Sequence, residues 1–296
     1  MLKTAFRPLA GFSAVGYSLA FPMKAKLISL WNWFEIFTVV AMSTGAVAVV
    51  FVATTPFDRV RKVTGRFFRV CGTMLVRLNP LWSVKVSGWK RPKNSGPFIV
   101  VANHQSIADI PAISYLPWEM KWLSKESNFK VPGLGWMMSM AGDIPLRRGE
   151  KESAKSAMER CKWYLDRGMS VMIFPEGTRS HDGEIKPFKD GAFRLALETG
   201  VPILPVAVAG TRHAIPKNSW VFGVKCQARI EVLPPIEVKG MSVEDLDKLR
   251  DHVRGEIAAA FERLGKWTPT LPEEDGAEDE VPEAATAPAM QASPPA

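Results

Sequence analysis

A histidine and an aspartate lie five positions apart directly after the apolar run 98–102. If Ser106 caps a helix here, the carboxylate of Asp109 can reach back to the imidazole of His104. A carboxylate that accepts from one ring nitrogen fixes the tautomer and leaves the other nitrogen to act as a general base. With four histidines in the chain, a loop histidine beside a solvated aspartate is the simpler interpretation of this pair alone.

A second polar segment follows the apolar run 170–174 and contains three residues suited to an anionic ligand. Gly177 permits close backbone approach, Thr178 offers a hydroxyl, and the planar fork of Arg179 matches phosphate or carboxylate oxygens. Glu176 would repel such a ligand unless it bonds a ligand hydroxyl or orients the arginine. The segment predicts a binding loop, and a polar turn with a structural Glu-Arg pair is the alternative.

Two adjacent arginines, Arg147 and Arg148, stand between Gly142 and Gly149. The flexibility of the two glycines would let both guanidinium groups converge on a phosphate, although most arginine pairs are simply solvated. The apolar segment 201–206 contains no titratable group, so it predicts a buried strand that shapes an apolar wall.

Short β-rich runs alternate with helical stretches from residue 82 onward, which predicts an α/β fold with a mixed sheet covered by helices. The expected strands are 83–86, 98–102, 120–123, 170–174, 203–209 and 228–233. The expected helices are 151–167, 191–199 and 243–264, the last beginning with a capping-box-like pair, Ser242 and Asp245.

Residues 36–55 are twenty consecutive uncharged, mostly apolar positions, enough for a helix to cross a bilayer. A cleaved signal peptide, a buried core helix and a hairpin that enters one leaflet are the alternatives. The basic flank is richer downstream, so the following residues are expected on the cytoplasmic side. The flanking residues are Lys24 and Lys26 upstream, and Arg59, Arg61, Lys62, Arg66 and Arg69 downstream.

Residues 57–78 carry an apolar stripe at helical spacing with basic residues between its members. A helix on the membrane surface and an ordinary amphipathic helix packed on the next domain fit this pattern about equally. The stripe consists of Val60, Val63, Phe67, Val70, Met74 and Leu78.

Composition divides the chain into three parts: a membrane-associated helical region (1–80), one α/β domain (81–267) and an acidic tail rich in Pro and Ala that is expected to be disordered (268–296). The net charge is +8, and the residues before the acidic tail carry a larger positive excess. A basic body favours an anionic partner such as a phospholipid surface, a phosphorylated ligand or an acidic carrier protein.

Several function classes lose support from the sequence. The three cysteines are far apart and include no C-x-x-C pair, which argues against a disulfide framework or a zinc site. We find no phosphate loop, no dinucleotide-binding glycine motif, no G-x-S-x-G elbow and no nucleic-acid-binding signature. Nucleotide hydrolysis, dinucleotide redox chemistry, serine hydrolysis and nucleic-acid binding are therefore disfavoured.

Taken in order, the four segments resemble motifs I to IV of the glycerolipid acyltransferases, particularly the bacterial 1-acyl-sn-glycerol-3-phosphate acyltransferases. His104 and Asp109 match the H-x-x-x-x-D element, and 174–180 match F-P-E-G-T-R-S at every position. The resemblance implies that His104 and Asp109 are catalytic. It also implies that Glu176, Gly177, Thr178, Arg179 and one of Arg147 and Arg148 bind the acceptor substrate.

The resemblance further implies a membrane-bound enzyme that moves a fatty acyl chain from acyl-CoA or acyl carrier protein to the 2-hydroxyl of lysophosphatidic acid. The expected location is a bacterial inner membrane, with the catalytic domain facing the cytoplasm. Beyond the acyl donor we expect no cofactor and no metal, because a thioester is already activated. Acylation of another lyso-lipid is one alternative, and a non-catalytic basic protein that docks on membranes is the other.

Overall fold

The computed structural model describes residues 23–91, 95–180, 183–212, 214, 221–222 and 225–265. The expected disordered tail, 268–296, and the side chain of Lys24 lie outside the described residues.

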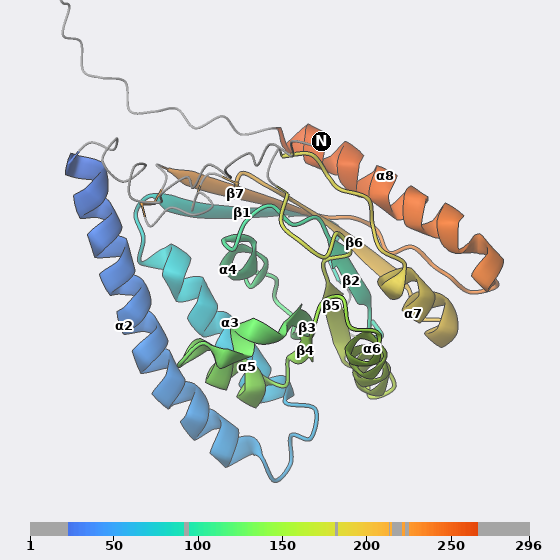
Figure 1. The fold of residues 1–296 in the computed structure, drawn as a ribbon, viewed down its shortest axis with the longest axis horizontal. Helices are drawn as coiled ribbons and strands as arrows, with labels where there is room; N and C mark the ends of the chain where they lie inside the picture. The colour runs from blue at the N-terminus through green and yellow to red at the C-terminus, as the bar shows by residue number, and fades with distance from the viewer. Residues whose placement is uncertain are drawn as a thin grey trace, which may run out of the picture.

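A seven-stranded mixed sheet forms the centre of the fold, which confirms the predicted class (Figure 1). In spatial order its strands are β1 (Trp82–Gly88), β7 (Cys226–Val232), β6 (Ile203–Ala209), β2 (Ile99–Ala102), β5 (Ser170–Ile173), β3 (Met120–Lys125) and β4 (Ile144–Leu146). The five strands from β6 to β4 are parallel, whereas β7 runs antiparallel to β6 and parallel to β1. The sequence analysis missed β4, since its three residues with a central proline are too short to show a periodicity.

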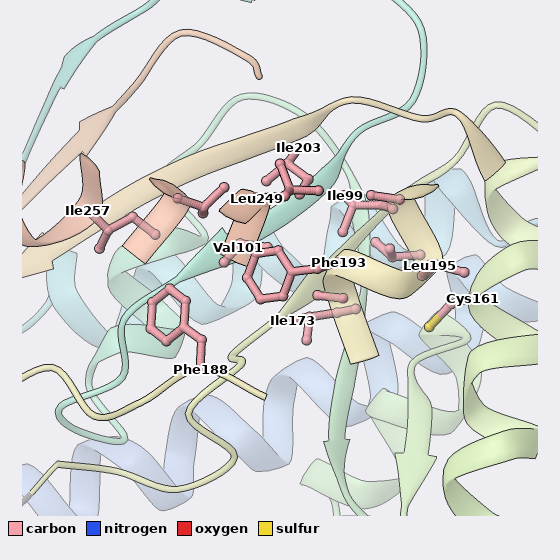
Figure 2. Close-up of a cluster of buried hydrophobic side chains, with 14 of the residues drawn as sticks. Ile99, Val101, Cys161, Ile173, Phe188, Phe193, Leu195, Ile203, Leu249 and Ile257 are labelled. Atoms are coloured by element: carbon pink, nitrogen blue, oxygen red, sulfur yellow. The ribbon is translucent and has the colours of Figure 1, made fainter. Parts of the chain in front are cut away.

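The central strands are buried on both faces, so they are continuously apolar and alternate their side chains between two cores. On one face Ile99, Val101 and Ile173 pack against three helices (Figure 2). These helices are α6 (Lys151–Leu165), α7 (Gly191–Thr199) and α8 (Leu246–Leu264). The 3-10 turn η2 (Val243–Asp245) precedes α8, and its Ser242–Asp245 capping box is present as predicted.

The other face of the sheet carries the short helix α4 (Asp109–Ile113) and, outside it, the N-terminal helices (Figure 1). Helix α2 (Met23–Thr54) packs on α3 (Lys62–Arg77) and on α5 (Leu134–Ala141), which follows the 3-10 helix η1 (Glu126–Lys130). Within α2 the stretch Lys26–Thr54 is long and apolar enough to cross a bilayer. The helix begins earlier than the predicted residue 36 and continues through Glu35, because Glu35 lies on its buried side.

Helix α3 leaves part of its apolar stripe exposed. Val63, Met74 and Leu78 from the predicted stripe are exposed, whereas Val60, Phe67 and Val70 are half-buried. Its buried side instead carries Thr64, Gly65, Phe68, Arg69, Cys71, Thr73 and Val76. The helix therefore packs on the protein through a face that mixes polar and apolar side chains, and it presents three apolar side chains away from it.

A buried ammonium group fixes the turn between α2 and α3 to the sheet. Lys121 of β3 is fully buried, and its Nζ donates to the carbonyl oxygens of Arg61 at 2.7 Å and of Ala141 at 2.8 Å. The same Nζ lies 3.0 Å from Oε1 of Glu119. Arg61 has the unusual φ of 56° at the start of α3, so the ammonium group stabilises the carbonyl of a strained turn residue.

Two of the basic residues that follow the predicted membrane segment form contacts within the protein. The guanidinium of Arg69 is buried, pairs with the carboxylate of Asp143 and lies over the ring of Trp122. Arg66 donates to the carbonyl oxygen of Leu116 at 2.7 Å. These contacts hold α3 on β3 and on the residue before β4, so they do not contribute to a positive membrane flank.

We predict that Gly65→Ala destabilises the protein, because a Cβ there would lie 2.0 Å from Oε1 of Glu119 and 2.6 Å from Nζ of Lys121. Both neighbours are buried, so the overlap should cost about 1–3 kcal/mol of unfolding free energy in a denaturant titration. Gly72→Ala on the same helix is the control: its Cβ would meet only Ser114, at 3.7 Å or more. That variant should gain about 0.5–1 kcal/mol from helix propensity, and equal losses in both variants would refute the prediction.

Candidate active site

All the predicted site residues follow the carboxyl ends of parallel strands. His104 comes after β2, Glu176 to Arg179 come after β5, and Arg148 comes after β4. Because parallel strands end at one edge of a sheet, segments far apart in sequence are brought to the same edge, where ligands of α/β sheets commonly bind.

The carboxylate of Asp109 is the centre around which the loop 104–109 folds. Its Oδ2 lies 2.8 Å from Nδ1 of His104 and accepts from the backbone N–H groups of Gln105 at 2.7 Å and Ser106 at 3.0 Å. Asp109 has no exposed surface, whereas the His104 side chain is 13% exposed. The expected contact between the two side chains is therefore present, with the imidazole at the surface of the site and the acid behind it.

Two contacts around this pair were missed by the sequence analysis. The hydroxyl of Thr211 donates to Oδ1 of Asp109, and the ring of Phe174 stacks on the imidazole of His104 with centroids 4.1 Å apart. Thr211 could have been found, since it follows the predicted strand 203–209 and would share an edge with His104. With Thr211 and Phe174 the imidazole and its acid are held from several sides.

Glu176 joins the second segment to the first. It is buried, its Oε1 accepts from the backbone N–H of His104 at 2.7 Å, and its Oε2 accepts from that of Lys186 at 3.3 Å. The backbone N–H of Ser180 also donates to the carbonyl oxygen of His104, at 2.8 Å. Burial raises the pKa of the Glu176 carboxyl, and the two N–H groups oppose that rise. The geometry makes Glu176 a brace between the two loops.

The loop between Glu176 and Ser180 is close to the cations of the next segment. Gly177 has a φ of 69°, and a Cβ on it would lie 2.9 Å from Nζ of Lys189, so glycine suits both the backbone and the space. Lys186 Nζ donates to the carbonyl oxygen of Arg179 at 3.0 Å. Thr178 is exposed, and its hydroxyl donates to the same carbonyl at 3.1 Å.

The two adjacent arginines, Arg147 and Arg148, have different surroundings in the structure. Arg147 is bonded to Glu126 at 2.9 Å and to Glu150 at 2.8 Å, and these carboxylates raise its pKa. Arg148 is oriented differently: loss of hydration and the positive charge of Arg179 lower its pKa. Neither Arg148 nor Arg179 pairs with a carboxylate among the residues described. The two guanidinium groups are therefore close enough for the charge of Arg179 to act on Arg148.

An apolar cavity of about 80 Å³ lies next to this edge, between α2, α3, α4 and α5. Its wall includes Ile110 and Pro111, which directly follow Asp109, together with Val40, Phe68 and Met137. Among the described residues, no group of three His, Cys, Asp or Glu side chains could hold a metal ion. The site thus combines a buried acid, a histidine and two arginines with an apolar space nearby.

Comparison with known proteins points to one family. Residues 83–209 match the model of the Acyltransferase family. The chain is 34% identical to the chloroplastic 1-acyl-sn-glycerol-3-phosphate acyltransferase BAT2 of Brassica napus, over 69% of this chain and 58% of that protein. It is 30% identical to 1-acyl-sn-glycerol-3-phosphate acyltransferase alpha of Homo sapiens, over 76% of this chain and 80% of that one. The alignment therefore spans less than two thirds of the plant protein but most of the human one.

A solved structure agrees. The crystal structure of the 1-acyl-sn-glycerophosphate (LPA) acyltransferase PlsC from Thermotoga maritima superimposes with a TM-score of 0.67 and 30% sequence identity. The likeness covers 83% of this chain and 99% of that one.

We predict that Thr211→Val lowers the unfolding free energy by about 1–3 kcal/mol, because it removes a donor from a buried charge without changing the side-chain shape. Thr211 is itself fully buried, so water cannot replace the hydroxyl. Thr211→Ser keeps the hydroxyl and should lose less. Denaturant titration of both variants tests this, and equal stabilities would show that the hydrogen bond to Asp109 contributes nothing.

Proposed function

The chain belongs to the 1-acyl-sn-glycerol-3-phosphate acyltransferase family, and from that premise we propose that it transfers a fatty acyl chain to the 2-hydroxyl of lysophosphatidic acid, giving phosphatidic acid. The acyl donor in this proposal is acyl-CoA or acyl carrier protein. The observation that carries the proposal is the 2.8 Å contact of His104 with the buried Asp109, on a loop bonded directly to the arginine-bearing loop.

In the proposed reaction His104 is the general base. Its Nδ1 faces Asp109, so Nε2 is the nitrogen that takes the proton of the acceptor hydroxyl. The hydroxyl oxygen forms a bond to the thioester carbonyl carbon, and the carbon–sulfur bond then breaks. The leaving thiolate receives the proton from the imidazolium, which returns the histidine to its neutral form. Asp109 stabilises the imidazolium during the time that His104 carries the extra proton.

Arg179 and Arg148 hold the acceptor phosphate in this scheme. Their mutual repulsion favours binding of a dianion between them, because a phosphate monoester relieves it. Glu176, Gly177 and Thr178 shape the loop around the glycerol part of the acceptor. The reaction uses no cofactor or metal, since the activated thioester leaves only positioning and proton transfer to the protein.

We also propose that α2 and α3 dock the protein on a membrane and that α2 enters one leaflet instead of crossing the bilayer. One side of α2 is buried against the protein from Ser29 to Thr54, so lipid cannot surround the helix. Its other side exposes large apolar residues, among them Trp31, Phe34, Met42 and Val49. With the apolar stripe of α3 these residues form one lipid-facing surface. The catalytic part would face the cytoplasm, at a bacterial inner membrane.

We predict that His104→Ala lowers the rate of acyl transfer to lysophosphatidic acid by about 10²- to 10⁴-fold, the range for loss of a general base. The variant should still bind vesicles, because His104 is not on the apolar surface. The assay uses purified protein and each of the two donors in turn. His252→Ala on α8 is the control, since this exposed histidine lies far along the chain from the site and should leave the rate unchanged.

Two outcomes of this assay would contradict the proposal. A wild-type chain without transferase activity, but with vesicle binding, would favour a docking protein. Turnover of lysophosphatidylcholine in place of lysophosphatidic acid would favour a different acceptor and would remove the reason for the arginine pair.

We predict that the two arginines differ in function. Arg148→Ala should raise the KM for lysophosphatidic acid about 10- to 100-fold, because it removes a charged contact to the phosphate. Arg147→Ala should change KM less than about twofold, since Arg147 is already paired with Glu126 and Glu150 on the surface. Steady-state kinetics with varied acceptor test the difference, and the reverse order of the two effects would refute the assignment.

A further inference from the structure

We propose a second membrane contact, separate from α2 and α3: the turn that leads from η1 into α5 inserts Val131 and Trp136 among the lipids. Val131 is 45% exposed and Trp136 is 60% exposed. The neighbouring Lys130 is exposed at the end of η1 and suits an anionic headgroup. This inference rests on the proposed membrane docking and extends it to another part of the chain.

The contact between this turn and α2 makes the apolar surface continuous. A Cβ on Gly133 would lie 2.9 Å from Cγ1 of Val40 and 3.1 Å from Oγ1 of Thr44, so the backbone of the turn touches α2 directly. Gly133 has a φ of 74°, which lets the chain turn there. Val131 and Trp136 stand on either side of this glycine in the chain.

The neighbouring side of α2 is apolar and exposed. Phe37 precedes Val40 by three positions and Thr44 by seven, so the three residues lie along one line of the helix. Phe37 is 66% exposed. A lipid layer that covers Phe37 would extend along this line toward the turn at Gly133, since α2 carries no charged residue over 37–44.

A second contact off the axis of α2 would fix the orientation of the site. With only α2 and the exposed residues of α3 in contact with lipid, the protein can still tilt about the axis of α2. The turn belongs to the segment that follows β3 at the site edge of the sheet, and η1 is linked to the loop of Arg148 through the pair of Glu126 with Arg147. Insertion of the turn would hold this edge against the lipid surface, from which the acceptor is presented.

The test compares three double variants in flotation with vesicles of phosphatidylethanolamine and phosphatidylglycerol. Val131→Ser with Trp136→Ser should weaken vesicle binding about tenfold, the expected loss for two half-exposed apolar side chains. Met42→Ser with Val49→Ser on α2 is the positive comparison and should weaken it as well. Met241→Ser with Val243→Ser is the matched control: both residues are exposed, they precede α8 on the other face of the sheet, and binding should be unchanged.

Further measurements separate this inference from the proposed function. Turnover in detergent micelles should be unchanged in the Val131 and Trp136 variant, because neither residue belongs to the site. Trp136→Phe should keep vesicle binding and lose part of the tryptophan quenching by brominated lipids, which would locate Trp136 in the lipid layer.

Three results would overturn the inference. The first is that the α2 variant loses vesicle binding and the turn variant does not. This result would refute the contact at the turn and would still support the proposed docking by α2. Another is equal loss in the control variant. The third is a dimer in light scattering that the turn substitutions dissociate, which would make the surface a contact between two copies. A wild-type chain that binds vesicles through this turn but transfers no acyl chain would instead refute only the proposed function.

Discussion

The carboxylate of Asp109 accepts from four donors and has no exposed surface, and the geometry of the candidate site depends on it. A buried charge is costly unless it is hydrogen-bonded on all sides, so the donors cannot move away without a penalty. Two of them are backbone N–H groups of the loop that starts at His104, and one is the hydroxyl of Thr211 after β6. The same bonds that stabilise the acid therefore fix the imidazole relative to the sheet.

The parallel arrangement of β6, β2, β5, β3 and β4 explains why the site is assembled from distant segments. The site residues lie on loops that follow different strands, and each loop alone resembles an ordinary polar turn. Bonds between loops then set the final positions, as when Glu176 and Ser180 both bond to the backbone of His104. The positions of the site residues are therefore set by these hydrogen bonds between loops more than by any single motif.

Sequence patterns were sufficient for six of the seven strands and for the long helices, because apolar period and length determine those elements locally. They also brought His104 together with Asp109, since that contact depends on five residues of one loop. Sequence patterns did not predict contacts between residues that are far apart in the chain. Nothing near Arg147 indicates that Glu126 will pair with it and that Arg148 will stay without a carboxylate partner among the described residues. Nothing near Val63 indicates that this side of α3 will be exposed.

A buried arginine and a close glycine explain how α3 is oriented on the protein. The buried Arg69 needs Asp143, and Gly65 is small enough to let Glu119 and Lys121 come close, so the helix must turn that side to the sheet. Val63, Met74 and Leu78 then face outward, where exposure to water is unfavourable. The lipid surface proposed above would remove that cost and leave the buried charges in place. In that proposal the ion pair of Arg69 with Asp143, which orients α3, also determines which side of the protein meets the lipid.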